Sequence, residues 1–221
     1  MNNQSKSLNT KILIVDDHPT FIEGVSVILQ SIIPNTIPLS SLNGKDALKT
    51  ININPDIEWI FLDINLPDYN GIELLEHFEK NRVLANIIIM TSANDPSIID
   101  EVLKHHAAGF LTKDFNRQIL ADCIKTVEMG NIFLTTDHEK QLRNYRESLL
   151  REKQIIEDNL SERQKQTLLL IVKGYSNREI AESLGISEST VKTHVSSLIS
   201  LFEADNRTHC VAEARRLQIV S

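Results

Sequence analysis

Apolar and polar positions follow two different rhythms along the first 129 residues of the chain. Short, nearly continuous apolar runs end at polar turn residues, as is typical of buried parallel strands; they lie at 11–15, 36–39, 59–63, 87–90 and 109–112. The segments that follow carry apolar residues at three- and four-residue spacing, which indicates helices, at 21–32, 44–51, 71–79, 96–103 and 117–128. Strands that alternate with helices predict an α/β, doubly wound, five-stranded parallel sheet.

The segment 137–158 has no strand pattern. It is charged and free of Gly and Pro, which favours a helix, and Leu142, Leu149 and Ile156 recur in it every seven residues. Three such positions leave two interpretations open. The segment is either a solvated linker helix, or a helix that pairs with its copy in a dimer or docks on a domain.

The last part of the chain contains three helix-capping patterns, which start at Ser161, Ser176 and Ser187, and a fourth helix follows Asn206. Each pattern places a capping hydroxyl before a helical run, so we expect four helices with a helix-turn-helix in the middle. The predicted organisation is a disordered N-terminus, an α/β domain, a largely helical linker and an all-α domain, at 1–10, 11–129, 130–158 and 159–221.

Charge is distributed unevenly over these parts. Residues 1–129 carry 10 Lys/Arg against 17 Asp/Glu, whereas residues 160–221 carry 8 against 7. The asymmetry indicates two units with different partners. No signal peptide or transmembrane run is recognisable, and Cys123 and Cys210 have no metal-like spacing, so we expect a cytoplasmic protein with reduced cysteines and no membrane partner.

Residues able to do chemistry gather at the carboxyl ends of the predicted strands. Asp63 ends the third strand, and the other strand-end residues are Asp16, Asp17, Thr91 and Lys113. These ends meet at one edge of a parallel sheet, where ligands bind. Three carboxylates there attract a hard cation such as Mg²⁺. Asp63 can then serve as a metal ligand, a general base or a nucleophile toward a phosphoryl group, with Lys113 balancing its charge.

This constellation, with the turn 66–71 and the run 109–113, resembles the receiver domain of two-component response regulators. The resemblance implies a flavodoxin-like fold, Mg²⁺ as cofactor and a sensor histidine kinase as phosphoryl donor. It assigns Asp63 as the phosphoacceptor, with Asp17 as a direct Mg²⁺ ligand, Asp16 as a ligand through water and the Asn65 backbone carbonyl as a third protein oxygen. It also makes Thr91 and Phe110 a coupled switch pair, next to Lys113 as the phosphoryl-binding cation.

The segment 158–218 resembles the LuxR-type helix-turn-helix of NarL/FixJ-type response regulators, through the runs 176–181, 184–195 and 206–208. The resemblance implies that residues 188–201 form a recognition helix that enters the major groove of double-stranded DNA. The implied DNA-contacting residues are Lys192, Thr193 and Ser196 in the groove, with Ser176, Thr190 and His194 at phosphates or in supporting positions.

One departure from the family pattern concerns the end of this helix. The family has an Arg/Lys-Lys pair where this chain has Ser200 and Leu201, and the domain carries a net charge of only +1 from its 8 basic and 7 acidic residues. Phosphate neutralisation supplies most non-specific DNA affinity, so we expect weak binding by a monomer and a homodimer on paired half-sites after phosphorylation.

The sequence therefore predicts a transcription factor switched by phosphorylation of Asp63, and two alternatives accompany this prediction. A phosphohydrolase of the haloacid dehalogenase kind also uses a strand-end Asp, but that class needs a second Asp where this chain has Asn65. A receiver whose output domain binds a protein in place of DNA would explain the missing basic pair. We expect no turnover of an external substrate.

Overall fold

The computed structural model describes residues 9–220, and these divide into two compact units, with the boundary between Leu142 and Arg143. The predicted disordered segment 1–10 lies outside the described residues except for its last two positions, of which Thr10 begins the first strand. None of the helices in the described part combines the length and the apolar character needed to cross a bilayer.

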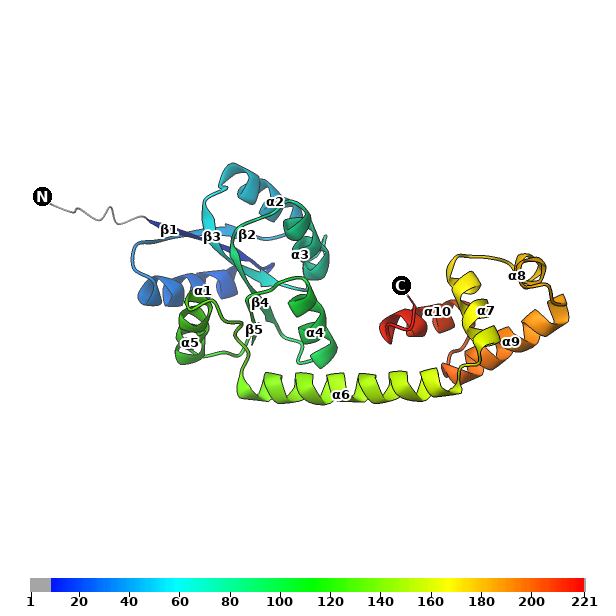
Figure 1. The fold of residues 1–221 in the computed structure, drawn as a ribbon. Coiled ribbons are helices and arrows are strands. Elements are labelled where there is room, and N and C mark those ends of the chain that lie inside the picture. The colour runs from blue at the N-terminus through cyan, green and yellow to red at the C-terminus, as the bar shows by residue number, and fades with distance from the viewer. Residues whose placement is uncertain (1–8, 221) are drawn as a thin grey trace, which may run out of the picture. The chain divides into compact units, whose positions relative to one another are not determined.

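The first unit is the predicted doubly wound sheet (Figure 1). Its five strands are all parallel in the order β2-β1-β3-β4-β5, with bounds β1 Thr10–Val15, β2 Thr36–Ser41, β3 Ile57–Asp63, β4 Asn86–Thr91 and β5 Gly109–Thr112. The register pairs Val15 with Leu62, Asp63 with Met90 and Thr91 with Thr112. The strands that carry the candidate residues therefore end at the same edge, as predicted.

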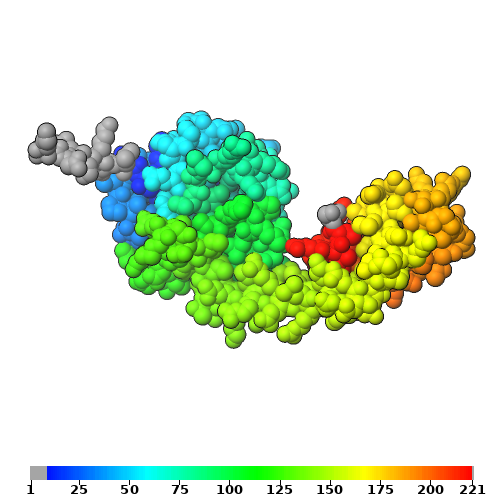
Figure 2. Space-filling view, viewed as in Figure 1, coloured from blue at the N-terminus to red at the C-terminus, as the bar shows by residue number. Residues whose placement is uncertain are grey.

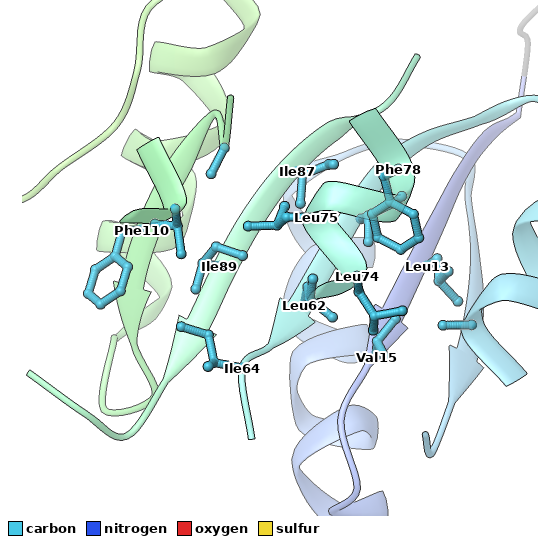
Figure 3. Close-up of a cluster of buried hydrophobic side chains, with 14 of the residues drawn as sticks. Leu13, Val15, Leu62, Ile64, Leu74, Leu75, Phe78, Ile87, Ile89 and Phe110 are labelled. Carbon is cyan, nitrogen blue, oxygen red and sulfur yellow. The ribbon is translucent and has the colours of Figure 1, made fainter. Parts of the chain in front are cut away.

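Helices cover both faces of the sheet, and each face has its own core. Helices α1 (Pro19–Ile32) and α5 (Arg117–Glu128) pack on one face against β-strand residues such as Phe61 and Met90. Helices α2 (Gly44–Ile53), α3 (Gly71–Lys80) and α4 (Pro96–Lys104) cover the other face. Figure 3 shows this second core, which runs from Leu13 on β1 to Phe110 on β5.

The segment predicted to be helical forms the long helix α6 (Thr136–Asn159), whose residues are divided between the two units. Its first turns belong to the first unit, where buried Leu142 joins the core that contains Phe110. Farther along, Leu149 and Ile156 pack in the core of the second unit. Each of the three residues that recur every seven positions therefore packs in the core of one unit.

The second unit contains four further helices, α7 Glu162–Val172, α8 Asn177–Leu184, α9 Glu188–Leu201 and α10 Arg207–Arg216. The predicted caps are present: Ser161 and Ser176 form complete capping boxes, and the Ser187 side chain accepts from the Thr190 amide. Gly185 ends α8 at φ 65°, a left-handed conformation that glycine adopts without steric cost. Figure 2 shows α7, α8 and α9 (yellow to orange) gathered in one body.

Both cysteines are free and buried, one in the core of each unit, as predicted. Burial raises the pKa of the Cys123 thiol to about 12, and burial raises that of Cys210 to about 11 against a smaller opposing effect of Arg207. Such thiols remain protonated at neutral pH and are poor nucleophiles or metal ligands.

Candidate functional site

Asp63 lies at the carboxyl end of β3, and only 2% of its surface is exposed. Lys113, which follows β5, donates from Nζ to Asp63 Oδ2 at 2.7 Å. The same ammonium lies 2.7 Å from Asp16 Oδ2. The other oxygen of Asp63 accepts from the backbone N–H of Asn65 at 3.2 Å. One cation thus holds together two carboxylates that come from separate strands.

The acidic pair after β1 is divided between the interior and the surface. Asp16 is fully buried, whereas the Asp17 side chain is 36% exposed. His18, which caps α1, places Nδ1 3.1 Å from Asp16 Oδ1 and 2.8 Å from Asp17 Oδ1. Of the residues that the structure describes, these three form a group whose ligand atoms are close enough to share a metal ion. His18 thus combines the N-cap position of α1 with contacts to both carboxylates.

The turn after Asp63 is fastened to a neighbouring helix. The Asp68 carboxylate accepts from the backbone N–H groups of Gly44 and Lys45, at 2.8 and 3.1 Å, at the start of α2. Gly71 lies so close to the end of β3 that an added Cβ would come 2.6 Å from the Ile64 Cα atom. This close approach requires glycine at position 71, and it fixes the loop that leaves the candidate phosphoacceptor.

Thr91 and Phe110, the predicted switch pair, are both fully buried. Thr91 ends β4, and its hydroxyl oxygen accepts from the Ala93 amide at 3.1 Å. Its carbonyl oxygen accepts from the Lys113 amide at 2.9 Å, which ties the ends of β4 and β5 together. Phe110 lies on β5 and meets the edge of the His138 ring on α6, with ring centroids 5.0 Å apart and the planes at 85°.

Burial and charge act against each other at the site. Burial raises the pKa of Asp63, the Lys113 hydrogen bond opposes this, and the neighbouring Asp16 adds to the rise. Burial alone would lower the pKa of Lys113, but its bonds to Asp16 and Asp63 prevail and raise it. Lys113 is therefore firmly protonated, and it compensates for part of the negative charge of the three carboxylates.

The donor set fits Mg²⁺. Asp16 Oδ2 is buried and lies 2.7 Å from the Lys113 ammonium, which Asp63 shares. One ammonium cannot balance the charges of Asp16, Asp17 and Asp63, so the site favours a further cation. Carboxylate oxygens with solvent access through Asp17 are the ligands that Mg²⁺ prefers. A nitrogen ligand such as His18 suits transition metals better.

The candidate DNA-contacting residues all lie on or next to the pair α8–α9. Thr190, Lys192, Thr193 and Ser196 are exposed on α9, and His194 is half-buried on the same helix. Ser176 is the N-cap of α8, where it accepts from the Glu179 amide at 3.3 Å. Lys192 Nζ lies 3.4 Å from Glu188 Oε1, one turn earlier.

The end of α9 has the uncharged character that the sequence indicated. Ser200 is exposed and Leu201 half-buried, while Phe202 is buried in the core of the second unit. Ser200 belongs to a shallow polar hollow lined by Asn159, Gln164, Ser196, Ser197, Ser200 and Leu201. The motif residue Arg207 has a structural role, because its guanidinium donates to Tyr175 O and to Asn177 Oδ1 and so fastens α10 to the start of α8.

Sequence reasoning missed two features of the first unit. It gave no role to His138, because a single His in a charged, helix-prone segment carries no signal of burial. It also did not assign Asp68 to the start of α2, although Asp68 stands beside Gly44 in space and a carboxylate at a helix N-terminus is a recognisable pairing.

Comparison with known proteins identifies both units. Residues 12–125 match the response regulator receiver domain, and residues 158–214 match the luxR family of bacterial regulatory proteins. The chain belongs to the two-component response regulators with a LuxR-type DNA-binding domain, a family of transcription regulators and not of enzymes. The phosphohydrolase alternative is therefore wrong.

Relatives of this kind extend over the whole chain. The transcriptional regulatory protein DegU of Brevibacillus brevis is 31% identical, with 97% of this chain and 96% of that protein covered. YdfI of Bacillus subtilis is 32% identical over 96% of this chain and 98% of its own. Among solved structures, response regulator ChrA matches with a TM-score of 0.51 at 26% identity, over 96% of this chain and all of that one. RcsB of Salmonella typhimurium matches with a TM-score of 0.57 at 22% identity, over 96% and 99%.

Proposed function

We propose that the receiver unit accepts a phosphoryl group on Asp63 and thereby controls DNA binding by the second unit. The observation that carries the proposal is the buried strand-end carboxylate of Asp63, held by Lys113 beside Asp16. The relatives DegU and YdfI are transcriptional regulators, and the partner that the receiver domain implies is a sensor histidine kinase in the same cytoplasm.

The proposed reaction transfers a phosphoryl group from an imidazole nitrogen of the kinase to a carboxylate oxygen of Asp63. A carboxylate oxygen of Asp63 attacks phosphorus and forms an acyl phosphate, while the bond from phosphorus to the donor nitrogen breaks and the donor imidazole keeps the electron pair. Lys113 donates to the phosphoryl oxygens as their charge develops. The Thr91 hydroxyl, released from the Ala93 amide, donates to another of these oxygens.

Asp16, Asp17, Asp63 and the Asn65 carbonyl are the groups that we expect to hold Mg²⁺. When bound, the ion neutralises carboxylate charge and polarises the phosphoryl oxygens. The buried carboxylate of Asp16, which lies next to Asp17 and shares Lys113 with Asp63, supports this assignment. Asp17, with its partial exposure, suits a direct ligand that retains access to solvent.

The phosphoacceptor is tested with acetyl phosphate and Mg²⁺, which supply the group without a kinase, followed by intact-mass measurement. We expect one phosphoryl mass on the wild type and none on Asp63→Asn. Asp68→Asn is the matched control, because it changes an exposed Asp five residues on and keeps an acceptor for the Gly44 amide. Equal mass gain by Asp63→Asn and the wild type would contradict the assignment.

For the output, we propose that α9 enters the major groove and that phosphorylation pairs two chains on adjacent half-sites. RcsB, which has this fold, has been solved as dimers bound to DNA. In this chain the support is the helix-turn-helix built from α8, Gly185 and α9, with four candidate side chains exposed on α9. On DNA binding, the Lys192 ammonium would leave Glu188 and contact a base or a phosphate.

The test is selection of genomic fragments with phosphorylated protein, followed by binding measurements at two salt concentrations. We expect Lys192→Ala to weaken binding to selected fragments, and Lys173→Ala, an exposed lysine after α7, to change it less. If the phosphorylated chain enriches no DNA fragment but retains a protein, the result supports the alternative in which the second unit binds a protein in place of DNA. Sedimentation before and after phosphorylation reports the dimer.

A further inference from the structure

We propose that His138 couples Phe110 to helix α6, so that phosphorylation changes how the first turns of α6 are held against the receiver core. This inference rests on the proposed function, because it needs Phe110 to respond to the phosphoryl group. It concerns contacts within the first unit alone.

The Phe110–His138 contact is buried and directional. Phe110 is fully buried and His138 is 4% exposed, and their rings meet edge to face at 5.0 Å. Leu142, one turn beyond His138, enters the same hydrophobic core as Phe110. Residues four apart lie on one face of a helix, so His138 and Leu142 together attach α6 to this core.

The backbone around Phe110 is joined to the segment that leads into α6. The Phe110 amide donates to Phe133 O at 3.1 Å, and the Phe133 amide donates to Ala108 O at 2.9 Å. Phe133 also forms a parallel bridge with Gly109. The segment before α6 therefore extends the sheet edge beyond β5, and a displacement of Phe110 reaches α6 through both backbone and side chain.

No hydrogen bond at Nδ1 fixes the His138 ring in place. Its Nδ1 atom is buried without a hydrogen-bond partner, and so is Gln141 Oε1. Both residues line a cavity of about 340 Å³ whose other walls include Asp114, Phe115 and Asp137. A ring held by packing on Phe110, with open space beside it, can follow Phe110 when that side chain moves.

The surroundings of His138 determine which protonation state of its ring packs on Phe110. Burial lowers the pKa of His138, whereas the carboxylates of Asp137 and Asp114 oppose the effect. The neutral imidazole is thus the form that packs on Phe110 at neutral pH. Coupling between two sites is reciprocal, so detachment of α6 must also alter the equilibrium of the phosphoryl site.

Hydrogen exchange of the full chain, followed by mass spectrometry with and without acetyl phosphate and Mg²⁺, tests the coupling. In the wild type we expect phosphorylation to change exchange severalfold over residues 136–142. His138→Ala should gain the phosphoryl mass as the wild type does but lose that change. His138→Phe, which keeps a ring on Phe110, should retain it, and Lys140→Ala is the control on the exposed face of the same turn.

The outcomes separate the coupling from the proposed function. If the wild type gains no phosphoryl mass, the proposed function fails and the coupling fails with it. Mass gain with unchanged exchange over 136–142 overturns the coupling alone, and so does a full response in His138→Ala. If His138→Ala does not fold, the comparison of His138→Phe with the wild type decides. Loss of the exchange response in His138→Phe, which keeps a ring on Phe110, would contradict the role of the ring.

Discussion

Replacing Lys113 by Met removes the cation shared by two buried carboxylates while it keeps a side chain of similar length. Lys113 Nζ lies 2.7 Å from both Asp16 Oδ2 and Asp63 Oδ2. At an effective dielectric constant of about 20, each pair has a gross attraction of roughly 6 kcal/mol. Desolvation offsets most of that sum, but Lys113→Met leaves two buried charges without their partner.

Breaking a buried ion pair costs about 3–5 kcal/mol. The Lys113 side chain is 15% exposed, so water can enter the space that Met leaves. We therefore expect the free energy of unfolding to fall by about 3 kcal/mol, at the lower end of this range. The difference in stability between Lys113→Met and the wild type should become smaller as the pH falls. Burial raises the pKa of Asp63 above its ordinary value of 3.8, and removal of Lys113 raises it further. The folded state then takes up a proton before the unfolded state does, and this stabilises the variant as the pH falls through the folded pKa toward 3.8.

Urea unfolding at about pH 7 and about pH 5 without divalent cations measures both effects. Trp59, the single tryptophan of the chain, lies on β3 and reports on the first unit alone. Lys80→Met is the matched control, because that lysine is 75% exposed and pairs with Glu76 on the surface, where a loss of about 0.5 kcal/mol is expected. A Lys113→Met variant as stable as Lys80→Met at neutral pH would refute the reasoning.

Three further predictions follow from the same geometry. Mg²⁺ at ten times its dissociation constant should stabilise the first unit by about 1.4 kcal/mol in the same urea assay, and Asp17→Asn should lose most of this gain. Gly71→Ala should destabilise the unit by about 1–3 kcal/mol because the added Cβ meets backbone, whereas Gly24→Ala, in an open position of α1, should stabilise it by about 0.5–1 kcal/mol. In DNA binding, the double change Ser200→Arg with Leu201→Lys should raise affinity at low salt and steepen the salt dependence by roughly 0.9 per added phosphate contact; an unchanged slope would mean that the end of α9 does not face phosphates.

Local sequence signals predicted the fold because each element carries its own period and its own stop signal. The bounds expected for β5, α5 and α9 agree with the observed ones, since each begins at a glycine, a cap or a charged turn. Asp63 could be assigned to the site because a buried strand must deliver the residue after its apolar run to the carboxyl edge. Parallel pairing then brings Thr91 and Lys113 to the same edge.

Contacts between elements distant in sequence could not be predicted in this way. The distance between Lys113 and Asp16 depends on how the sheet twists and on the loops, which no local pattern encodes. The position of His138 depends on where α6 begins and on which face meets β5. Leu142, in contrast, carried a signal as part of a seven-residue stripe, but the stripe did not specify that it would pack with Phe110.

Under the proposed function, the electrostatics of the site give phosphorylation of Asp63 a route to α6. Two buried carboxylates share one ammonium and the partly exposed Asp17 adds a third negative charge beside them, so three negative charges less one positive leave a net of two. Lys113 and a bound cation would hold these charges together, and the proposed phosphoryl group on Asp63 would rearrange the donors around both. Lys113 and Thr91 are joined through the backbone, and Phe110 lies on β5, three residues before Lys113. We therefore expect a change in the charge on Asp63 to act on β5, whose Phe110 packs against His138, and the cavity beside the His138 ring leaves room for that ring to move.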